Sequence, residues 1–345
     1  MTEPRKPVGV LLLNLGTPDS PSVGDVRRYL RQFLWDPRVI NLPRPLRWLL
    51  LNLVILPFRP QRSAAAYQKI WTPDGSPLMH FGRSLAAGVS DALGDHFRVE
   101  LAMRYGSPSI EHGLTTLLAT DPGSIVVLPL FPQYAIASTG SALAEVARVL
   151  ETIETPPPVN TMGAFYDHPN FIAAMTAVAE PVLEQFEPDH VVMSFHGLPE
   201  WQVRDLDVSG RHCLVKPDCC EVVCAENRNC YRAHCFATAR ALRLALALKE
   251  QDTSLVFQSR LGRTPWLEPD LVEVLPQLAA RGIKRPAVFC PAFVADCLET
   301  VEEVGIRARA QWLELGGEEL CLVPCVNAEP VWVEGMTSMI REVVG

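Results

Sequence analysis

Eight short apolar runs, separated by longer stretches of helical periodicity, are the feature that most limits how this chain can fold. They cover residues 8–15, 98–103, 124–130, 159–165, 190–195, 254–259, 286–291 and 319–324. Strands that alternate with helices form parallel sheets, because parallel neighbours need a crossover connection, and the helices then cover both faces. We therefore predict an α/β protein with two similar doubly wound units, each a mainly four-stranded parallel sheet flanked by helices.

The two halves of the chain also resemble each other. The first contains VGVLLLNLGTP at 8–18 and the second HVVMSFHGLP at 190–199, each a buried strand that ends at a glycine where a loop begins. A length of 345 residues also favours two domains. We predict a first unit over 1–165, a second unit over 166–325 with an inserted segment at 205–235, and a C-terminal helix at 326–345 that packs back on the body. The active cleft is expected between the two units.

In doubly wound sheets, ligands bind at the carboxyl ends of the strands. The residues that follow the predicted strands are therefore candidates for the site, and they are Leu15, Arg104, Tyr134, His196, Arg260 and Asp296. Neither GXGXXG after a strand nor GXXXXGK[ST] occurs in the chain, so nucleotide binding has no support.

The charge and the N-terminal sequence exclude several classes of protein. A formal net charge of −8 argues against non-specific binding to nucleic acid. The first apolar run is too short for a signal peptide, so we expect a cytoplasmic protein. Ten cysteines in that compartment favour free thiols or metal ligands over disulfides.

A second apolar run, from Trp48 to Phe58, is too short to cross a bilayer. It suits a buried helix. Because basic residues flank it, it also suits an exposed apolar lip over residues 46–58 that touches a membrane surface or a greasy anionic ligand. The flanking residues are Arg44, Arg47, Arg59 and Arg62. They favour the lip, and with it a peripheral contact on the inner face of the membrane.

His196 ends the apolar strand VVMSF and is followed by Gly197 and Pro199, which form a tight loop. A histidine can take or give a proton near neutral pH and can ligate a metal. The plain alternative is a hydrogen-bonded histidine at a strand end with no catalytic role. The position at the functional edge of the sheet favours a catalytic base or a metal ligand.

The segment DCLETVEE, with Asp296, Glu299 and Glu303, follows the strand AVFCPAF and opens a helix. One interpretation is structural, with Asp296 as the N-cap and Glu299 as its capping-box partner. The other is that Glu299 and Glu303, four residues apart on one helical face, line a cavity and handle cations or protons. The second interpretation depends on His196 lying opposite them.

A third candidate is the loop with Tyr134 and the helix that opens at Ser138, Thr139, Gly140 and Ser141. Hydroxyls and free N–H groups at a helix start bind an anionic substituent such as a carboxylate. The same residues also suit an ordinary helix cap, and both interpretations stay open.

Six cysteines follow His196, and they are Cys213, Cys219, Cys220, Cys224, Cys230 and Cys235. Their spacing lacks the two-residue pairs of most zinc ribbons and the common ferredoxin pattern, while His212 and His234 add further donors. A structural metal in an inserted loop is favoured over a set of free thiols.

These features together suit a flat, hydrophobic, carboxylate-bearing ligand and a divalent cation. At this level of detail the chain resembles the ferrochelatases, lyases that insert ferrous iron into a porphyrin in haem synthesis. The matching segments occur in family order over nearly the whole chain, and they are LLLNLGTP, YQKIWTPDGSPL, MRYGSP, LPLFPQYAIASTGS, SFHGLP, FQSRLGRTPWLEP and PAFVADCLETVEE. The resemblance implies insertion of Fe²⁺ into protoporphyrin IX to give protohaem, with release of two protons.

The resemblance also assigns roles by position. It makes His196 the histidine beside the porphyrin centre and Glu299 its acidic partner, both near the incoming iron, with Asp296 conducting protons or delivering the metal. Whether His196 ligates iron or only accepts protons stays open. Contacts to the porphyrin fall on Leu15, Arg104, Tyr105, Tyr134 and Trp266, and the helix-start argument adds Ser138.

The chain departs from the family pattern at two places. Cys297 stands where some relatives have a histidine, and the cysteine-rich segment is an insertion rather than a C-terminal extension. The insertion resembles an internal 2Fe-2S site. We expect Cys213, Cys219, Cys220 and Cys230 as its ligands, with Cys224 and Cys235 in reserve.

Three other functions stay open. The substrate could be coproporphyrin III, although the apolar lip favours protoporphyrin. A cobalt chelatase would act on a more polar tetrapyrrole, which the lip disfavours. A non-catalytic porphyrin or haem carrier with a redox-sensing cluster would tolerate loss of His196.

Overall fold

The computed structural model describes residues 6–345 other than residue 263, and the chain divides into two compact units. Unit 1 comprises Met1–Leu130, Ile136–Gly163 and Val333–Gly345, and unit 2 comprises Phe131–Ala135 and Ala164–Trp332. Each unit contains one four-stranded sheet, and all the strand pairs are parallel. The predicted fold class is confirmed, and all eight predicted strands are found in the described part of the chain.

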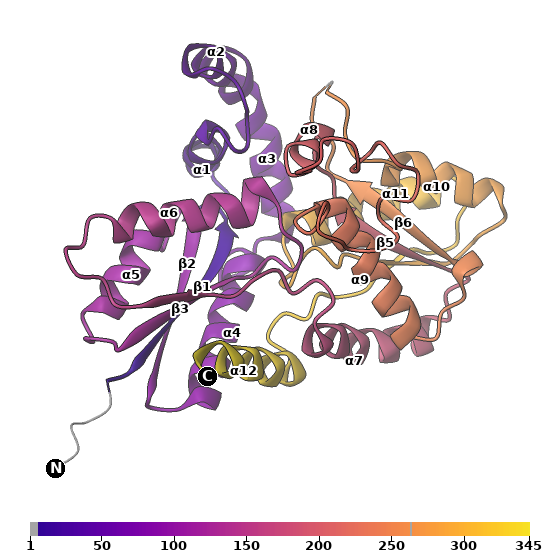
Figure 1. Cartoon of the computed structure of the whole chain (residues 1–345). Helices are drawn as coiled ribbons and strands as arrows, with labels where there is room; N and C mark the ends of the chain where they lie inside the picture. Colours follow the sequence, from indigo (N-terminus) through magenta and orange to yellow (C-terminus); the bar gives the residue numbers. More distant parts are fainter. Residues whose placement is uncertain (1–5, 263) are drawn as a thin grey trace. The chain divides into compact units, whose positions relative to one another are not determined.

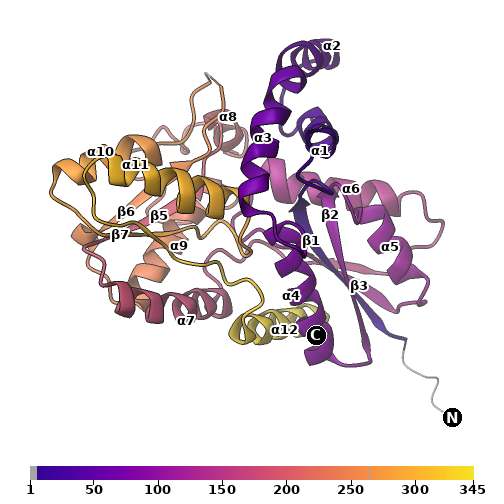
Figure 2. The same ribbon diagram turned by 180° about the vertical axis from the view of Figure 1, so that it is seen from behind.

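The sheet of unit 1 has the strand order β2-β1-β3-β4. Its strands are β1 (Val8–Gly16), β2 (Phe97–Tyr105), β3 (Ser124–Pro129) and β4 (Val159–Thr161). Its helices are α1 (Val23–Trp35), α2 (Arg44–Leu49), η1 (Leu50–Ile55), α3 (Leu56–Ile70), α4 (Pro77–Leu93), α5 (Ile110–Leu118), η2 (Ile136–Gly140), α6 (Ser141–Leu150) and most of α12 (Pro330–Val344). Helices α5 and α6 lie on one face of the sheet, and α4 and α12 lie on the other (Figures 1 and 2).

Both faces of this sheet are covered closely. Leu11 is paired with Glu100, so Leu11 and Leu101 point to opposite faces. A Cβ atom added at Gly113 of α5 would lie 2.8 Å from Leu11 Cδ1, and one added at Gly82 of α4 would lie 3.0 Å from Leu101 Cδ2. Burial on both faces explains why the strands are continuous apolar runs rather than alternating ones.

Unit 2 repeats the topology with the order β6-β5-β7-β8. Its strands are β5 (His190–His196), β6 (Thr253–Gln258), β7 (Pro286–Phe289) and β8 (Cys321–Leu322). Its helices are α7 (Pro169–Phe186), α8 (Glu200–Arg204), α9 (Tyr231–Ala245), η3 (Glu250–Asp252), α10 (Leu271–Ala280), η4 (Leu298–Ala308) and α11 (Arg309–Glu314). On one sheet face Val192, Val256 and Val288 pack with Leu275 and Trp312 from α10 and α11.

In both sheets the first strand lies between the second and the third, so the winding direction reverses between β1 and β3 and between β5 and β7. Ligands of doubly wound sheets bind outside the carboxyl ends of the strands at this switch point. The helices that follow β3 and β7 begin there as π-helices, η2 and η4, where the sequence pattern predicts α-helices. Such helices are rare and often mark functional sites.

Gly16 closes β1 with a φ of +121°, and a Cβ atom there would lie 1.8 Å from the Tyr105 carbonyl oxygen. We expect Gly16→Ala to lower the free energy of unfolding by about 3–5 kcal/mol, because the strained backbone and the steric clash act together. Gly94 has a φ of +79° but nothing within 4 Å, so Gly94→Ala should cost only about 1–2 kcal/mol. Equal losses in urea unfolding would contradict this account of the strand end.

Candidate functional site

His196 is the last residue of β5 and lies at the switch point of unit 2. Its Nδ1 lies 2.6 Å from the carbonyl oxygen of Gly197. A carbonyl can only accept a hydrogen bond, so Nδ1 carries the proton and Nε2 keeps its lone pair. The half-buried ring packs against Phe293, with 6.3 Å between ring centroids. The backbone therefore selects the tautomer in which Nε2 can accept a proton or bind a metal.

The structure brings Glu299 and Glu303 to the same place. Burial raises the pKa of Glu303, and the Glu299 charge raises it further, whereas Ser259, Arg307 and His196 lower it. Glu303 therefore lies within electrostatic reach of both His196 and Glu299. Sequence reasoning paired Glu303 with Glu299 on one helix face but did not select it as a site residue.

The structural interpretation of Asp296 and Glu299 is wrong, because the N-cap of η4 is Cys297 and its capping-box partner is Thr300. Asp296 is instead buried, and its carboxylate accepts hydrogen bonds from Thr300 Oγ1 and Asn327 Nδ2, both at 2.8 Å. These bonds hold the carboxylate beside the start of η4.

Gln258 links these elements and was missed from the sequence. Its Oε1 accepts from Ser194 Oγ at 2.7 Å, its Nε2 donates to the Glu299 carbonyl at 2.7 Å, and its own carbonyl accepts from the Gly197 N–H at 2.7 Å. It is 2% exposed at the end of β6. A polar residue directly after the apolar run LVF at the end of a strand was the available signal.

In unit 1, Arg104 and Tyr105 belong to a buried network centred on Asp36. The Asp36 carboxylate accepts from Arg104 Nη2 at 2.9 Å, from Tyr105 Oη at 3.0 Å and from Ser141 Oγ at 2.5 Å. Arg104 Nε also donates to Ser141. Tyr105 is 1% exposed, so its hydroxyl supports Asp36 and Arg104 from within the core.

The remaining predicted contacts lie at strand ends or loops. Leu15 and Ser138 are half-buried in unit 1, the second of them within η2. In unit 2, Tyr134 is half-buried, and Trp266 lies against Gly197, with Cε3 3.3 Å from where a Cβ would stand. The Trp266 indole N–H is buried and, among the described residues, has no hydrogen-bond partner.

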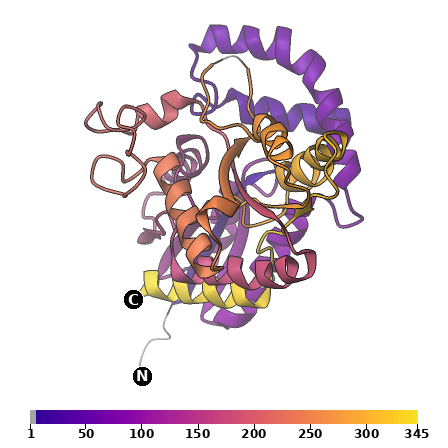
Figure 3. The same cartoon turned by 90° about the vertical axis from the view of Figure 1, so that its right-hand side faces the viewer.

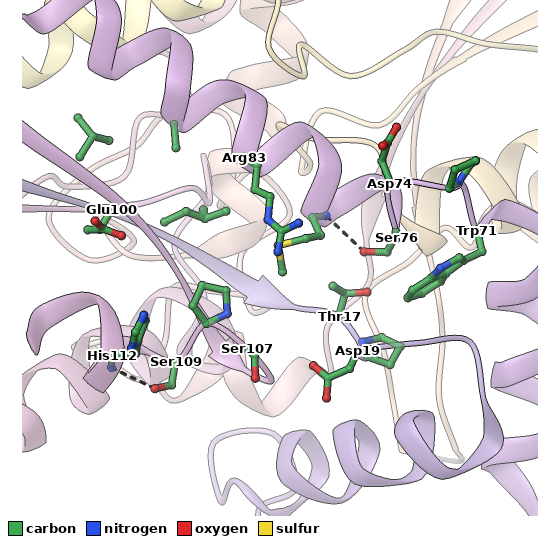
Figure 4. Close-up of a pocket in the computed structure, with 18 residues that line it drawn as sticks. Thr17, Asp19, Trp71, Asp74, Ser76, Arg83, Glu100, Ser107, Ser109 and His112 are labelled. Atoms are coloured by element: carbon green, nitrogen blue, oxygen red, sulfur yellow. Dashed lines mark hydrogen bonds between the residues drawn. The ribbon is translucent and has the colours of Figure 1, made fainter. Parts of the chain in front are cut away.

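Unit 1 also contains a cavity of about 1000 Å³ beside β2 (Figure 4). Its lining includes Thr17, Trp71, Asp74, Arg83 and His112. None of the residues predicted to bind substrate lines it, so it is distinct from the sequence-predicted site.

The cysteine-rich segment forms irregular loops that project beside α9 in unit 2 (Figure 3). Cys213, Cys219, Cys220 and Cys230 are at most 3% exposed. The Cys230 thiol lies close enough to those of Cys213 and Cys220 to affect their pKa values, and the Sγ atoms of Cys219 and Cys220 lie 3.8 Å apart. Burial raises the pKa of Cys213 to about 11, so the metal-free thiol holds its proton.

The reserve cysteines have other neighbours. Cys224 Sγ lies 3.8 Å from His212 Nε2, and the fully buried Cys235 thiol lies close enough to Tyr231 for the two groups to affect each other's pKa. In the described part of the chain, no group of three or more histidine, cysteine or acidic side chains is arranged to hold a single metal ion. Two thiolates on one tetrahedral metal with bonds of about 2.3 Å stand about 3.8 Å apart, so the Cys219 and Cys220 pair matches that spacing.

Polar side chains shape this segment in place of an apolar core. The Asp207 carboxylate accepts from the N–H groups of Ser209, His212 and Cys213 at 2.7–2.9 Å. Although burial opposes it, these bonds and the Ser209 hydroxyl hold the pKa of Asp207 well below its usual value. The fully buried Asn227 side chain donates to the carbonyls of Cys219 and Val222.

Most of the apolar run of unit 1 is exposed, although Leu51 and Leu56 are buried, so the run is not a buried helix. Trp48, Leu53 and Phe58 are 52%, 61% and 70% exposed. Arg47 is 4% exposed and stacks on Trp35, so it is not an exposed basic residue beside the lip, as the sequence had predicted. No helix among the described residues is long and apolar enough to span a membrane.

The two units define an α/β protein of the parallel doubly wound class, with a histidine and carboxylates at the switch point of unit 2. The structure has the fold of the sirohydrochlorin chelatase SirB, solved from Bacillus subtilis subspecies spizizenii with cobalt, at a TM-score of 0.52 and 12% identity. That match covers 98% of this chain and 95% of SirB. SirB from Bacillus subtilis with Fe³⁺ aligns with a TM-score of 0.53 over the same shares, at 13% identity.

Sequence comparison identifies the family. The ferrochelatase family profile matches residues 7–344. The chain is 48% identical over 337 residues to a ferrochelatase of Coxiella burnetii (strain Dugway 5J108-111), covering 97% of this chain and 93% of the relative. It is 44% identical over 334 residues to a ferrochelatase of Legionella pneumophila (strain Lens), covering 97% and 98%. The chain belongs to the ferrochelatase family.

Asp36 provides a test of the Arg104 network. Burial alone would raise its pKa, but hydrogen bonds from Ser141, Arg38 and Tyr105 and the Arg104 charge hold this pKa below its usual value. A carboxyl whose pKa is lowered by folding stabilises the fold at pH values above its ordinary pKa. This stabilisation is lost as the pH falls through the lowered pKa. We expect Asp36→Asn to cost about 3 kcal/mol at pH 7, with a smaller deficit below about pH 4.

The control is Asp121→Asn, which removes an exposed ion pair with Lys6 and should cost at most about 1 kcal/mol. Urea unfolding at several pH values measures both variants. A deficit for Asp36→Asn that does not change with pH would contradict the electrostatic account.

Proposed function

We propose that this protein inserts Fe²⁺ into protoporphyrin IX, giving protohaem and two protons in haem synthesis. The observation that carries the proposal is the arrangement of His196, Glu299 and Glu303 at the β5/β7 switch point of a chain that the family profile matches over residues 7–344. The fixed tautomer of His196 leaves Nε2 free to act.

The reaction requires a base because two pyrrole N–H protons must leave as the metal enters. His196 accepts these protons through Nε2, and Glu299 and Asp296 pass them on or deliver iron. Burial raises the pKa of Glu303, which suits a carboxyl that holds a transferred proton. Glu299 is a proposed ligand of the incoming iron, which is a substrate here. Nε2 of His196 is the other proposed ligand, at the stage before it accepts a proton, because its one lone pair cannot bind both.

The proposed porphyrin contacts combine apolar and polar groups. Leu15 lies over one porphyrin face, and Tyr134 and Trp266 contact the ring, with the free Trp266 N–H as a hydrogen-bond donor. Arg104 and Ser138 bind the carboxylates. Tyr105 holds Asp36 and thereby the guanidinium of Arg104.

The exposed lip runs from α2 through η1 to the start of α3. It bears on which porphyrin is the substrate and on whether the protein acts at a membrane. Its side chains Leu46, Trp48, Leu53, Val54 and Phe58 are more than half exposed. Such a surface favours protoporphyrin over the more polar coproporphyrin III. We also propose that it contacts the inner face of the cytoplasmic membrane, with Arg44 and Arg62 near anionic headgroups.

We further propose a 2Fe-2S cluster on Cys213, Cys219, Cys220 and Cys230. Such a cluster takes four thiolates, and Cys213, Cys219, Cys220 and Cys230 would supply them, with the Sγ atoms of Cys219 and Cys220 3.8 Å apart. The guanidinium of Arg232, whose Nη1 lies 3.0 Å from Cys220 Sγ, would stabilise the thiolate charge. When bound, such a cluster supplies a one-electron redox centre and a crosslink between distant parts of the segment.

Anaerobic incubation with ferrous iron and protoporphyrin tests the activity. The porphyrin spectrum should convert to that of protohaem with the wild type, and His196→Ala should slow conversion by about 10²–10⁴-fold because the base is lost. His168→Ala is the control, because His168 caps α7 and is not one of the proposed site residues. Undiminished conversion by His196→Ala would refute the assignment, and porphyrin binding without conversion by the wild type would favour a carrier. Faster conversion of coproporphyrin III would identify the alternative substrate.

Protein purified without oxygen tests the cluster. The wild type should be coloured and carry about two irons and two sulfides per chain, and Cys220→Ser should lose both. Cys321→Ser, which changes a cysteine of β8, should keep them. A colourless wild type with one bound zinc would show that the segment holds a different metal.

A further inference from the structure

Two hydrogen bonds lead from the first turn of α9 into the proposed site of unit 2. The hydroxyl of Tyr231 donates to the carbonyl oxygen of His196 at 2.8 Å. Nδ1 of His234 accepts from the backbone N–H of Tyr134 at 3.2 Å. Tyr231 and His234 are 5% and 1% exposed, so both bonds are shielded from water. The sequence analysis did not select Tyr231, and it named His234 only as a further metal donor.

The bond from Tyr231 fixes the peptide group between His196 and Gly197. On one side of that peptide the His196 carbonyl accepts from Tyr231, and on the other the Gly197 N–H donates to the Gln258 carbonyl at 2.7 Å. Glycine restricts its own torsions little, so these bonds must define the local geometry. The Gly197 carbonyl then accepts from His196 Nδ1, which sets the tautomer.

The bond from His234 fixes the loop Phe131–Ala135 in a similar way. Nε2 of His234 donates to the Arg228 carbonyl at 2.8 Å, so Nδ1 is the acceptor for Tyr134. Burial lowers the pKa of His234 to about 4, which keeps the ring neutral as this pattern requires. The ring also stacks on Tyr166, with 3.9 Å between centroids.

Neighbouring residues of the same turn face the thiols. Cys230 is the N-cap of α9, and its buried thiol makes no side-chain cap bond. Arg232 Nη1 donates to Cys220 Sγ at 3.0 Å. One helical turn therefore contacts the thiol group through Cys230 and Arg232, and the proposed site through Tyr231 and His234.

We infer that Tyr231 and His234 are positioning residues through which the cysteine-rich segment controls His196 and Tyr134. This inference rests on the proposed function for the roles of those two residues. Ordering of the segment at its thiols fixes the first turn of α9, and that turn fixes the His196 tautomer and the Tyr134 loop. Disorder of the segment releases both.

A plainer role for Tyr231 is to satisfy a buried carbonyl at a strand end. Tyr29 does this in unit 1, where its hydroxyl donates to the Gly16 carbonyl at 3.0 Å. No histidine stands at that strand end, because Leu15 takes the place of His196. The two tyrosines are thus a matched pair that separates loss of a hydrogen bond from loss of histidine positioning.

The experiment compares Tyr231→Phe with Tyr29→Phe in full-length protein labelled with ¹⁵N-histidine. The His196 ring signals are assigned by their loss in His196→Ala. Both variants should lower the melting temperature by similar amounts. Only Tyr231→Phe should change the His196 ring ¹⁵N shifts from the Nδ1–H pattern to an average of both tautomers. Its kcat should fall by about 10- to 100-fold at nearly unchanged KM, because a small misplacement of the base is costly.

Coupling to the thiols is tested with Cys213→Ser, which changes a residue far from α9 in sequence. It should give the same averaged His196 shifts as Tyr231→Phe. A wild-type pattern in Cys213→Ser would overturn control by the segment, and a wild-type pattern in Tyr231→Phe, or the same change in Tyr29→Phe, would overturn the positioning role. The ring shifts do not depend on turnover. If the wild type fails to metallate porphyrin while the shifts change as expected, the proposed function fails and the positioning role stands.

Discussion

The parallel pairing of β5 with β6 determines where the functional groups of unit 2 can lie. The last pair of this ladder joins His196 to Gln258. From there the Gln258 side chain bridges Ser194 to the Glu299 carbonyl, so one strand register fixes both the histidine and the start of η4. A slip of one residue would turn His196 to the other sheet face. The site therefore inherits its geometry from sheet pairing that is itself held by an apolar core.

The two units use one frame for different chemistry. The first strand of unit 1 ends at Gly16, and that of unit 2 ends at His196, just before Gly197. In each unit a tyrosine hydroxyl binds the carbonyl of the last strand residue, from Tyr29 to Gly16 and from Tyr231 to His196. At the equivalent position unit 1 carries Leu15 and unit 2 carries His196. The frame supplies a fixed, half-buried position at a switch point. The side chain placed there decides whether that position offers an apolar contact or a base.

Much of the fold could be predicted because strands buried on both faces are continuous apolar runs with clear ends. His196 and Glu299 could be predicted for the same reason, because each lies at or after the end of such a run. The π-helical geometry of η4 could not be predicted, because its hydrogen-bond spacing leaves no distinct apolar period in the sequence. Asp36 was missed because it meets Arg104 across 68 positions of sequence. The inward turn of Arg47 onto Trp35 likewise depends on a tertiary contact.

The cysteine-rich segment lacks the usual means of holding a loop in one conformation. Its valines at 208, 215 and 222 are 74%, 57% and 70% exposed, so apolar burial contributes little. Hydrogen bonds to Asp207 and Asn227 shape its turns, and the thiols are its main buried groups. Metal or cluster binding at those thiols would therefore act largely as folding energy for the segment. Cys230 is the N-cap of α9, and Tyr231 is the first residue of that helix. Binding at the thiols would therefore stabilise the position of His196 through the hydrogen bond from Tyr231, although no thiol enters the site.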